Sequence, residues 1–109
     1  NDMLRALDPA ITRSNLDAIL TALKKRGIRP ILLGMRAQPN LGADYVSAFE
    51  RIYPELAAKH DVPLFPFMLD GVAAVASLNQ PDGMHPNARG VGMMVDRLAP
   101  FLADILRKG

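Results

Sequence analysis

Asp82 and His85 have the residue types and the spacing of a proton-transfer pair. The aspartate precedes the histidine by three residues, in a segment that reads Asp-Gly-Met-His-Pro-Asn. A carboxylate at this spacing can accept a hydrogen bond from one imidazole nitrogen within a single turn, which sets the tautomer and leaves the other nitrogen as a base. The pattern indicates the base and the orienting carboxylate of a Ser-His-Asp triad. The alternative is structural, a turn aspartate beside a histidine that precedes a helix.

A hydroxyl nucleophile for this pair is harder to find. The chain has three serines, at positions 14, 47 and 77, and no cysteine. Ser14 and Ser47 fall on expected helices, and Ser77 lacks the strained, glycine-flanked turn that exposes a nucleophile. If the pair serves a serine, we therefore expect that serine outside these 109 residues.

Other chemistries have weaker support. Asp82 and His85 lack the further ligands that a zinc site requires, so no metal is expected. The second histidine, His60, ends an expected helix, where a cation interacts favourably with the helix dipole. The glycines at positions 90 and 92 lack the third glycine of a dinucleotide-binding loop and the strand before it. The basic residues 24–29 have no interleaved aromatic side chains, so no nucleic-acid partner is expected.

Composition places the chain among ordinary globular domains. Its 109 residues include 13 basic and 11 acidic side chains, a net charge of +2, and 50% are hydrophobic. This balance excludes a disordered tail, and the length allows one domain. No apolar run approaches the roughly 18 residues of a transmembrane segment. The sequence opens on Asn1 with neither a methionine nor a signal peptide, so we expect it to begin inside a longer chain.

Two helices precede the Asp82–His85 segment. Asp8 is an N-cap residue followed by proline, and with the apolar spacing that follows it predicts a helix from about residue 9 or 12 to residue 26, ending at Gly27. Apolar residues at helical spacing predict a second helix over about residues 43–60. Pro54 lies inside it, where we expect a kink or a detached last turn.

A third helix is expected directly after the pair. Asn87 can cap it, and Pro100 predicts a break within it. Its expected buried stripe consists of Val91, Met94, Val95, Leu98, Leu102 and Ile105.

Two apolar runs between the helices read as parallel strands. Residues 30–35 predict a strand buried on both faces, and the prolines within residues 62–69 predict a sheet edge. The order helix, strand, helix, strand, helix is half of a layered α/β fold. Two parallel strands do not make a stable sheet, so we expect this chain to pack against further strands.

The sequence resembles the SGNH (GDSL-type) hydrolases, in particular their bacterial thioesterase I and arylesterase branch. Asn1-Asp2-x-Leu4-Arg5 is similar to the end of the family's Gly-x-Asn-Asp block, and Asp82-x-x-His85-Pro86 is similar to its final block. The stretches between, including residues 32–42 and 62–67, also resemble this branch.

The resemblance implies the C-terminal part of a flavodoxin-like, three-layer α/β/α domain with a parallel sheet. Residues 1–109 would supply strands 4 and 5 of the strand order 2-1-3-4-5, and strands 1–3 with the nucleophile would come from elsewhere. It implies that His85 is the base and Asp82 its orienting carboxylate, and that Asn1 donates to the oxyanion. Met35, Leu69 and Met84 would line a substrate pocket, and the family uses no cofactor.

The resemblance also implies a partner and a substrate. The partner is the N-terminal fragment of the same domain with its Gly-Asp-Ser nucleophile, and the substrate is a small acyl or aryl ester. Assembly into a homo-oligomer is also compatible with the resemblance, and a periplasmic or secreted location is favoured over the cytoplasm.

The competing hypotheses for the function are a non-catalytic α/β interaction module, an inactive fragment and, more weakly, a nucleotide-binding half-domain.

Overall fold

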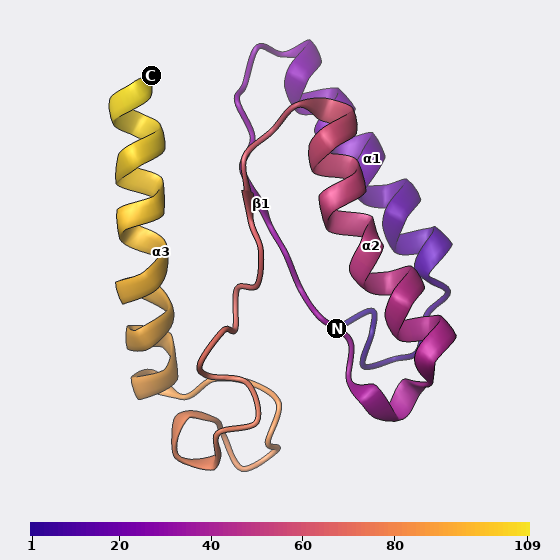
Figure 1. The fold of residues 1–109 in the computed structure, drawn as a ribbon, viewed down its shortest axis with the longest axis vertical. Coiled ribbons are helices and arrows are strands. Elements are labelled where there is room, and N and C mark those ends of the chain that lie inside the picture. The colour runs from indigo at the N-terminus through magenta and orange to yellow at the C-terminus, as the bar shows by residue number, and fades with distance from the viewer. The chain divides into compact units, whose positions relative to one another are not determined.

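The computed structural model describes residues 1–109, which form two compact units, Asn1–Pro66 and Phe67–Gly109. The first contains α1 (Pro9–Lys25), β1 (Leu32–Leu33), the 3-10 helix η1 (Pro39–Leu41), α2 (Ala43–His60) and β2 (Leu64–Phe65). The second contains the 3-10 helix η2 (Ala76–Leu78) and α3 (Ala88–Lys108). The chain therefore has an α/β fold with three α-helices and a small parallel sheet (Figure 1).

α1 begins and ends where its local sequence predicts. The Asp8 side chain accepts a hydrogen bond from the backbone N–H of Ala10, at 3.0 Å. At the other end, Gly27 has a φ of +70°, and the N–H of Ile28 donates to the carbonyl of Leu23 at 3.0 Å. This is the Schellman arrangement, in which glycine adopts the left-handed conformation at little cost. The first predicted helix is confirmed.

The internal prolines do not interrupt their helices. α2 runs through Pro54 to His60, and α3 runs through Pro100, so neither the detached turn predicted for α2 nor the break predicted for α3 is present. A proline inside a helix removes one hydrogen bond and crowds a carbonyl of the preceding turn. On either side of Pro54, however, Tyr53 and Leu56 are buried, and this packing holds α2 together across the proline.

The strands are shorter than their apolar runs. β1 and β2 pair in parallel over two residues each, with Leu32 opposite Leu64. Prolines limit the ladder, because Pro63 and Pro66 flank β2 and have no N–H to donate. The two predicted strands are confirmed, and their predicted lengths are wrong.

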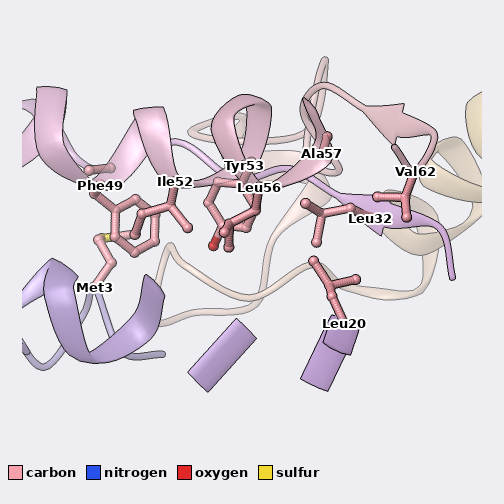
Figure 2. Packing of buried hydrophobic residues seen from close by; sticks show 10 residues of the cluster. Met3, Leu20, Leu32, Phe49, Ile52, Tyr53, Leu56, Ala57 and Val62 are labelled. Carbon is pink, nitrogen blue, oxygen red and sulfur yellow. The ribbon is translucent and has the colours of Figure 1, made fainter. Parts of the chain in front are cut away.

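The hydrophobic core of the first unit lies along α2. Ile52 is fully buried, and the ring of Phe49 meets that of Tyr53 edge to face with centroids 5.7 Å apart. Figure 2 shows these side chains in one packed layer with Leu20 of α1 and Leu32 of β1. α2 thereby joins the other helix of the unit to its sheet.

The second unit consists of turns and one long amphipathic helix. Asn87 caps α3 as predicted, because its side-chain oxygen accepts from the N–H of Gly90 at 3.0 Å. The predicted buried stripe is wrong: Val91 and Val95 are 47% and 54% exposed, and the other four residues of the stripe are only half-buried. η2 packs against α3 at its start, and no other element of this unit covers the rest of the apolar face. None of the helices combines the length and apolar character of a membrane span.

Candidate functional site

The Asp82 and His85 side chains are in direct contact. Oδ2 of Asp82 lies 2.7 Å from Nδ1 of His85. The other carboxylate oxygen, Oδ1, accepts from the backbone N–H groups of Met84 at 2.9 Å and His85 at 3.0 Å. Both side chains are close to half exposed, at 44% and 48%. The contact predicted from the three-residue spacing is therefore present, and the carboxylate and the imidazole meet within one turn.

The contact determines the charge and the tautomer of the pair. The pKa of Asp82 is lowered to about 2, chiefly by its hydrogen bond with the His85 side chain and then by the backbone N–H groups of Met84 and His85. Asp82 is thus ionised at neutral pH, and an ionised carboxylate only accepts hydrogen bonds. Nδ1 of His85 is therefore the donor, and in the neutral ring the lone pair is on Nε2. This is the tautomer that a general base needs.

A closed turn holds the pair. Gly83 has a φ of +71°, a left-handed conformation that suits glycine, and its N–H donates to the carbonyl of Gln80 at 2.9 Å. The N–H of Gln80 donates in turn to the carbonyl of His85 at 2.7 Å, next to an antiparallel bridge between Asn79 and Pro86. The turn is therefore closed by Gln80, which lies two residues before Asp82 and binds the carbonyl of His85 itself.

The other predicted site residues divide between the two units. Met84 lies between the members of the pair and is 45% exposed, and Leu69 is half-buried in the turns after β2. Asn1 and Met35 belong to the first unit. There both line a cavity of about 390 Å³, together with Leu32, Leu33, Phe49, Tyr53 and other residues of α1 and the N-terminal segment. The structure thus brings Asn1 together with Met35, and Asp82 together with His85.

His60 has a structural partner that sequence reasoning missed. Its ring is buried at 9% exposure, and Nε2 lies 2.6 Å from Oδ1 of Asp17, a residue 43 positions earlier on α1. The pKa of Asp17 is lowered by its hydrogen bonds with His60 and then Lys59. This histidine joins α1 to α2, in agreement with its predicted place at a helix end.

Asn79 and Gln80 also escaped the sequence reasoning. The buried Asn79 side chain donates to the carbonyls of Val72 and Val75 at 2.8 and 2.9 Å, and Gln80 donates to the carbonyl of Pro86 at 3.2 Å. The one available signal was two amide side chains placed directly before the turn. No group of three or more His, Asp or Glu side chains gathers in the structure as a metal site would need.

Comparison with known proteins gives a consistent set of similarities. Residues 1–92 match the sequence model of the GDSL-like Lipase/Acylhydrolase family. The chain is 38% identical over 108 residues to thioesterase 1/protease 1/lysophospholipase L1 of Escherichia coli, covering 99% of this chain and 48% of that protein. It is 35% identical over 106 residues to esterase TesA of Pseudomonas aeruginosa, covering 97% of this chain and 53% of that protein. The chain thus spans about half the length of these relatives.

Solved structures agree with the sequence matches. The crystal structure of AlinE4, an SGNH-hydrolase family esterase, is similar with a TM-score of 0.72 and 49% identity, over 97% of this chain and 56% of that one. At this identity, the likeness extends beyond the fold to the sequence itself.

Proposed function

Because the chain belongs to the GDSL-like lipase/acylhydrolase family, we propose that it supplies the base and the orienting carboxylate of a serine esterase or thioesterase. Its relatives are esterases and thioesterases, which supports hydrolase activity in general. The single observation that carries the finer proposal is the 2.7 Å contact between Oδ2 of Asp82 and Nδ1 of His85. The nucleophilic serine, in this proposal, lies outside residues 1–109.

In the proposed reaction, His85 accepts a proton and passes it on in each of two steps, acylation and deacylation. Nε2 takes the proton of the serine hydroxyl as its oxygen forms a bond to the ester carbonyl carbon, and the imidazolium returns that proton to the departing alcohol or thiol. A water molecule then attacks the acyl-enzyme in the same way, which releases the acid and restores the serine. Asp82 stays ionised throughout, stabilises the imidazolium and keeps the ring in its tautomer.

Asn1 is the proposed donor to the oxyanion. As the carbonyl carbon becomes tetrahedral, negative charge develops on its oxygen, and a side-chain N–H placed there stabilises the transition state. Loss of one such donor typically lowers the rate by about 10²–10³-fold. Membership of the family, whose sequence model matches residues 1–92, supports this role.

Substrate contacts are proposed for Met35, Leu69 and Met84. All three are apolar and partly exposed, as the lining of a pocket for an acyl or aryl group requires. We also propose that β1 and β2 are strands 4 and 5 of a flavodoxin-like sheet whose first three strands accompany the Gly-Asp-Ser nucleophile. The short two-stranded sheet supports this, because so small a sheet is marginal on its own.

The test is His85→Ala in the complete protein, assayed with p-nitrophenyl butyrate. We expect kcat to fall by at least about 10³-fold, since removal of a triad base disables both proton transfers. His60→Gln is the matched control, because it changes the other histidine, which contacts Asp17 between α1 and α2. A His85→Ala protein that keeps its full activity would contradict the proposal. A folded parent protein that is inert toward esters would favour the interaction module instead.

A further inference from the structure

We infer that Asn87 is a positioning residue for the Asp82–His85 pair, in addition to its role as a helix cap. Its hydrogen bonds connect the residue after their turn to the backbone of residues 77–79, which precede the turn. The inference rests on the proposed function, because it assigns Asn87 a part in keeping the base in place.

The observation is that Asn87 donates to three successive carbonyls. Its side-chain Nδ2 donates to the carbonyls of Ser77 at 2.9 Å and Asn79 at 3.2 Å, and its backbone N–H donates to that of Leu78 at 2.9 Å. A cap needs none of these bonds, since capping uses only the side-chain oxygen that accepts from Gly90. Asn87 therefore binds the segment before the turn and the first turn of α3 at the same time.

Two of the three residues whose carbonyls Asn87 binds are themselves buried. Leu78 and Asn79 are both 7% exposed, and the Asn79 side chain is bound to the carbonyls of Val72 and Val75. A buried, hydrogen-bonded segment of this kind is a rigid support, because moving it would leave polar groups without partners. Figure 1 shows this part of the chain as the coiled loop that leads into α3.

The turn between these anchors contains the catalytic pair. The turn begins at Gln80 and ends at Pro86. The backbone N–H of Gln80 donates to the carbonyl of His85, and its side-chain amide donates to the carbonyl of Pro86. His85 is thus two residues from Asn87, and its own carbonyl accepts a hydrogen bond from Gln80. Because a displacement of about 1 Å can lower a rate 10²-fold, loosening this end of the turn would misplace the imidazole.

The two roles of Asn87 can be separated by substitution. Aspartate and serine are N-caps of similar quality to asparagine, so both keep the acceptor for the Gly90 N–H. Neither has the Nδ2 donor, so both lose the bonds to Ser77 and Asn79. In Asn87→Asp, a carboxylate oxygen also faces those two carbonyls and repels them, whereas Asn87→Ser leaves their place to water.

The experiment measures ester hydrolysis by the complete protein with Asn87→Asp and with Asn87→Ser. We expect kcat to fall about tenfold to hundredfold in both variants, and KM to change less than about twofold, because no substrate contact is removed. The downfield proton resonance of His85 Nδ1, identified by its absence from His85→Ala, should broaden or vanish in both. A purely structural role would change neither kcat per folded molecule nor this resonance.

Asp8→Ala is the control for loss of stability. It removes the cap of α1 and should lower the melting temperature while leaving kcat unchanged. The inference fails if both Asn87 variants keep the parent kcat and the Nδ1 resonance while His85→Ala is inactive. If His85→Ala is itself active, the proposed function fails first. If Asn87→Asp does not fold, Asn87→Ser decides alone.

Discussion

At the scale of the residue, Asp82 is held ionised by its own turn. One oxygen binds the imidazole of His85, and the other binds the N–H groups of Met84 and His85. The hydrogen bonds to both oxygens favour the charged form of Asp82, because protonation of the carboxylate would disrupt them. The result is a carboxylate that stays negative at neutral pH beside the imidazole of His85.

The first prediction at this scale is the titration of Asp82. The carboxyl carbon resonance should titrate with a midpoint near 2, below the ordinary value of 3.8. In His85→Ala the midpoint should rise, because the largest cause of the shift is removed, but the two backbone N–H groups should keep it below 3.8. A midpoint of 3.8 in the parent protein would show that the contact does not hold the charge.

The same shift sets a direction for stability. The pKa of Asp82 is lower in the folded chain than in the unfolded one, so its contribution is fully present above about pH 4 and is lost as the pH falls toward 2. Urea unfolding at pH 5 and at pH 2.5 should therefore show a smaller acid loss for Asp82→Asn than for the parent. Asp96→Asn, an exposed carboxylate of α3, is the matched control and should behave like the parent.

At the scale of the element, the first turn of α3 lies directly on the backbone before the turn that contains Asp82 and His85. A Cβ at Gly90 would come within 2.2 Å of the carbonyl oxygen of Leu78. Glycine is thus required here by close approach, whereas Gly92 on the same helix has nothing within 4 Å of that position. Because Gly90 has no Cβ, α3 can lie against the Leu78 carbonyl, and Asn87 is then close enough to donate its hydrogen bonds to residues 77–79.

The prediction at this scale uses the two glycines as a matched pair. Gly90→Ala should lower the free energy of unfolding by about 1–3 kcal/mol, because the helix must move off the Leu78 carbonyl. Gly92→Ala should raise it by up to about 1 kcal/mol, since alanine favours the helix and meets no neighbour. Chemical denaturation of both variants measures the difference. Equal effects of the two substitutions would contradict the close approach.

At the scale of the whole molecule, hydrophobic burial is uneven along the chain. The core cluster lies entirely within the first unit, around α2. In the second unit the buried apolar side chains are Val72 and Leu78, and Val91, Val95 and Leu106 of α3 are exposed. The first unit therefore holds most of the apolar stabilisation, whereas the turn that contains Asp82 and His85 depends on backbone and amide hydrogen bonds.

The core prediction follows from this distribution. Ile52 is 0% exposed, so Ile52→Ala should lower the free energy of unfolding by about 2–5 kcal/mol through lost burial and a new cavity. Arg51→Ala, at the exposed neighbouring position, should change it by less than about 0.5 kcal/mol. Thermal unfolding followed by circular dichroism measures both. A small effect of Ile52→Ala would mean that this cluster is not the main core.

The features that the sequence determined by itself are those whose causes are local. α1 starts at the Asp8 cap and stops at Gly27, and the Asp82–His85 contact forms within one turn. The necessary partners lie a few residues apart, so residue types and spacing suffice to predict them.

Tertiary structure decided what depends on distant partners. The strands are only as long as their shared ladder allows, and His60 meets Asp17 across 43 residues. The sequence predicts only the capping role of Asn87. Its donor groups bind carbonyls up to ten residues earlier, and only the folded turn brings those carbonyls near. Val91 and Val95 follow the helical period of a buried stripe, yet burial requires an opposing surface, which periodicity within one helix does not supply.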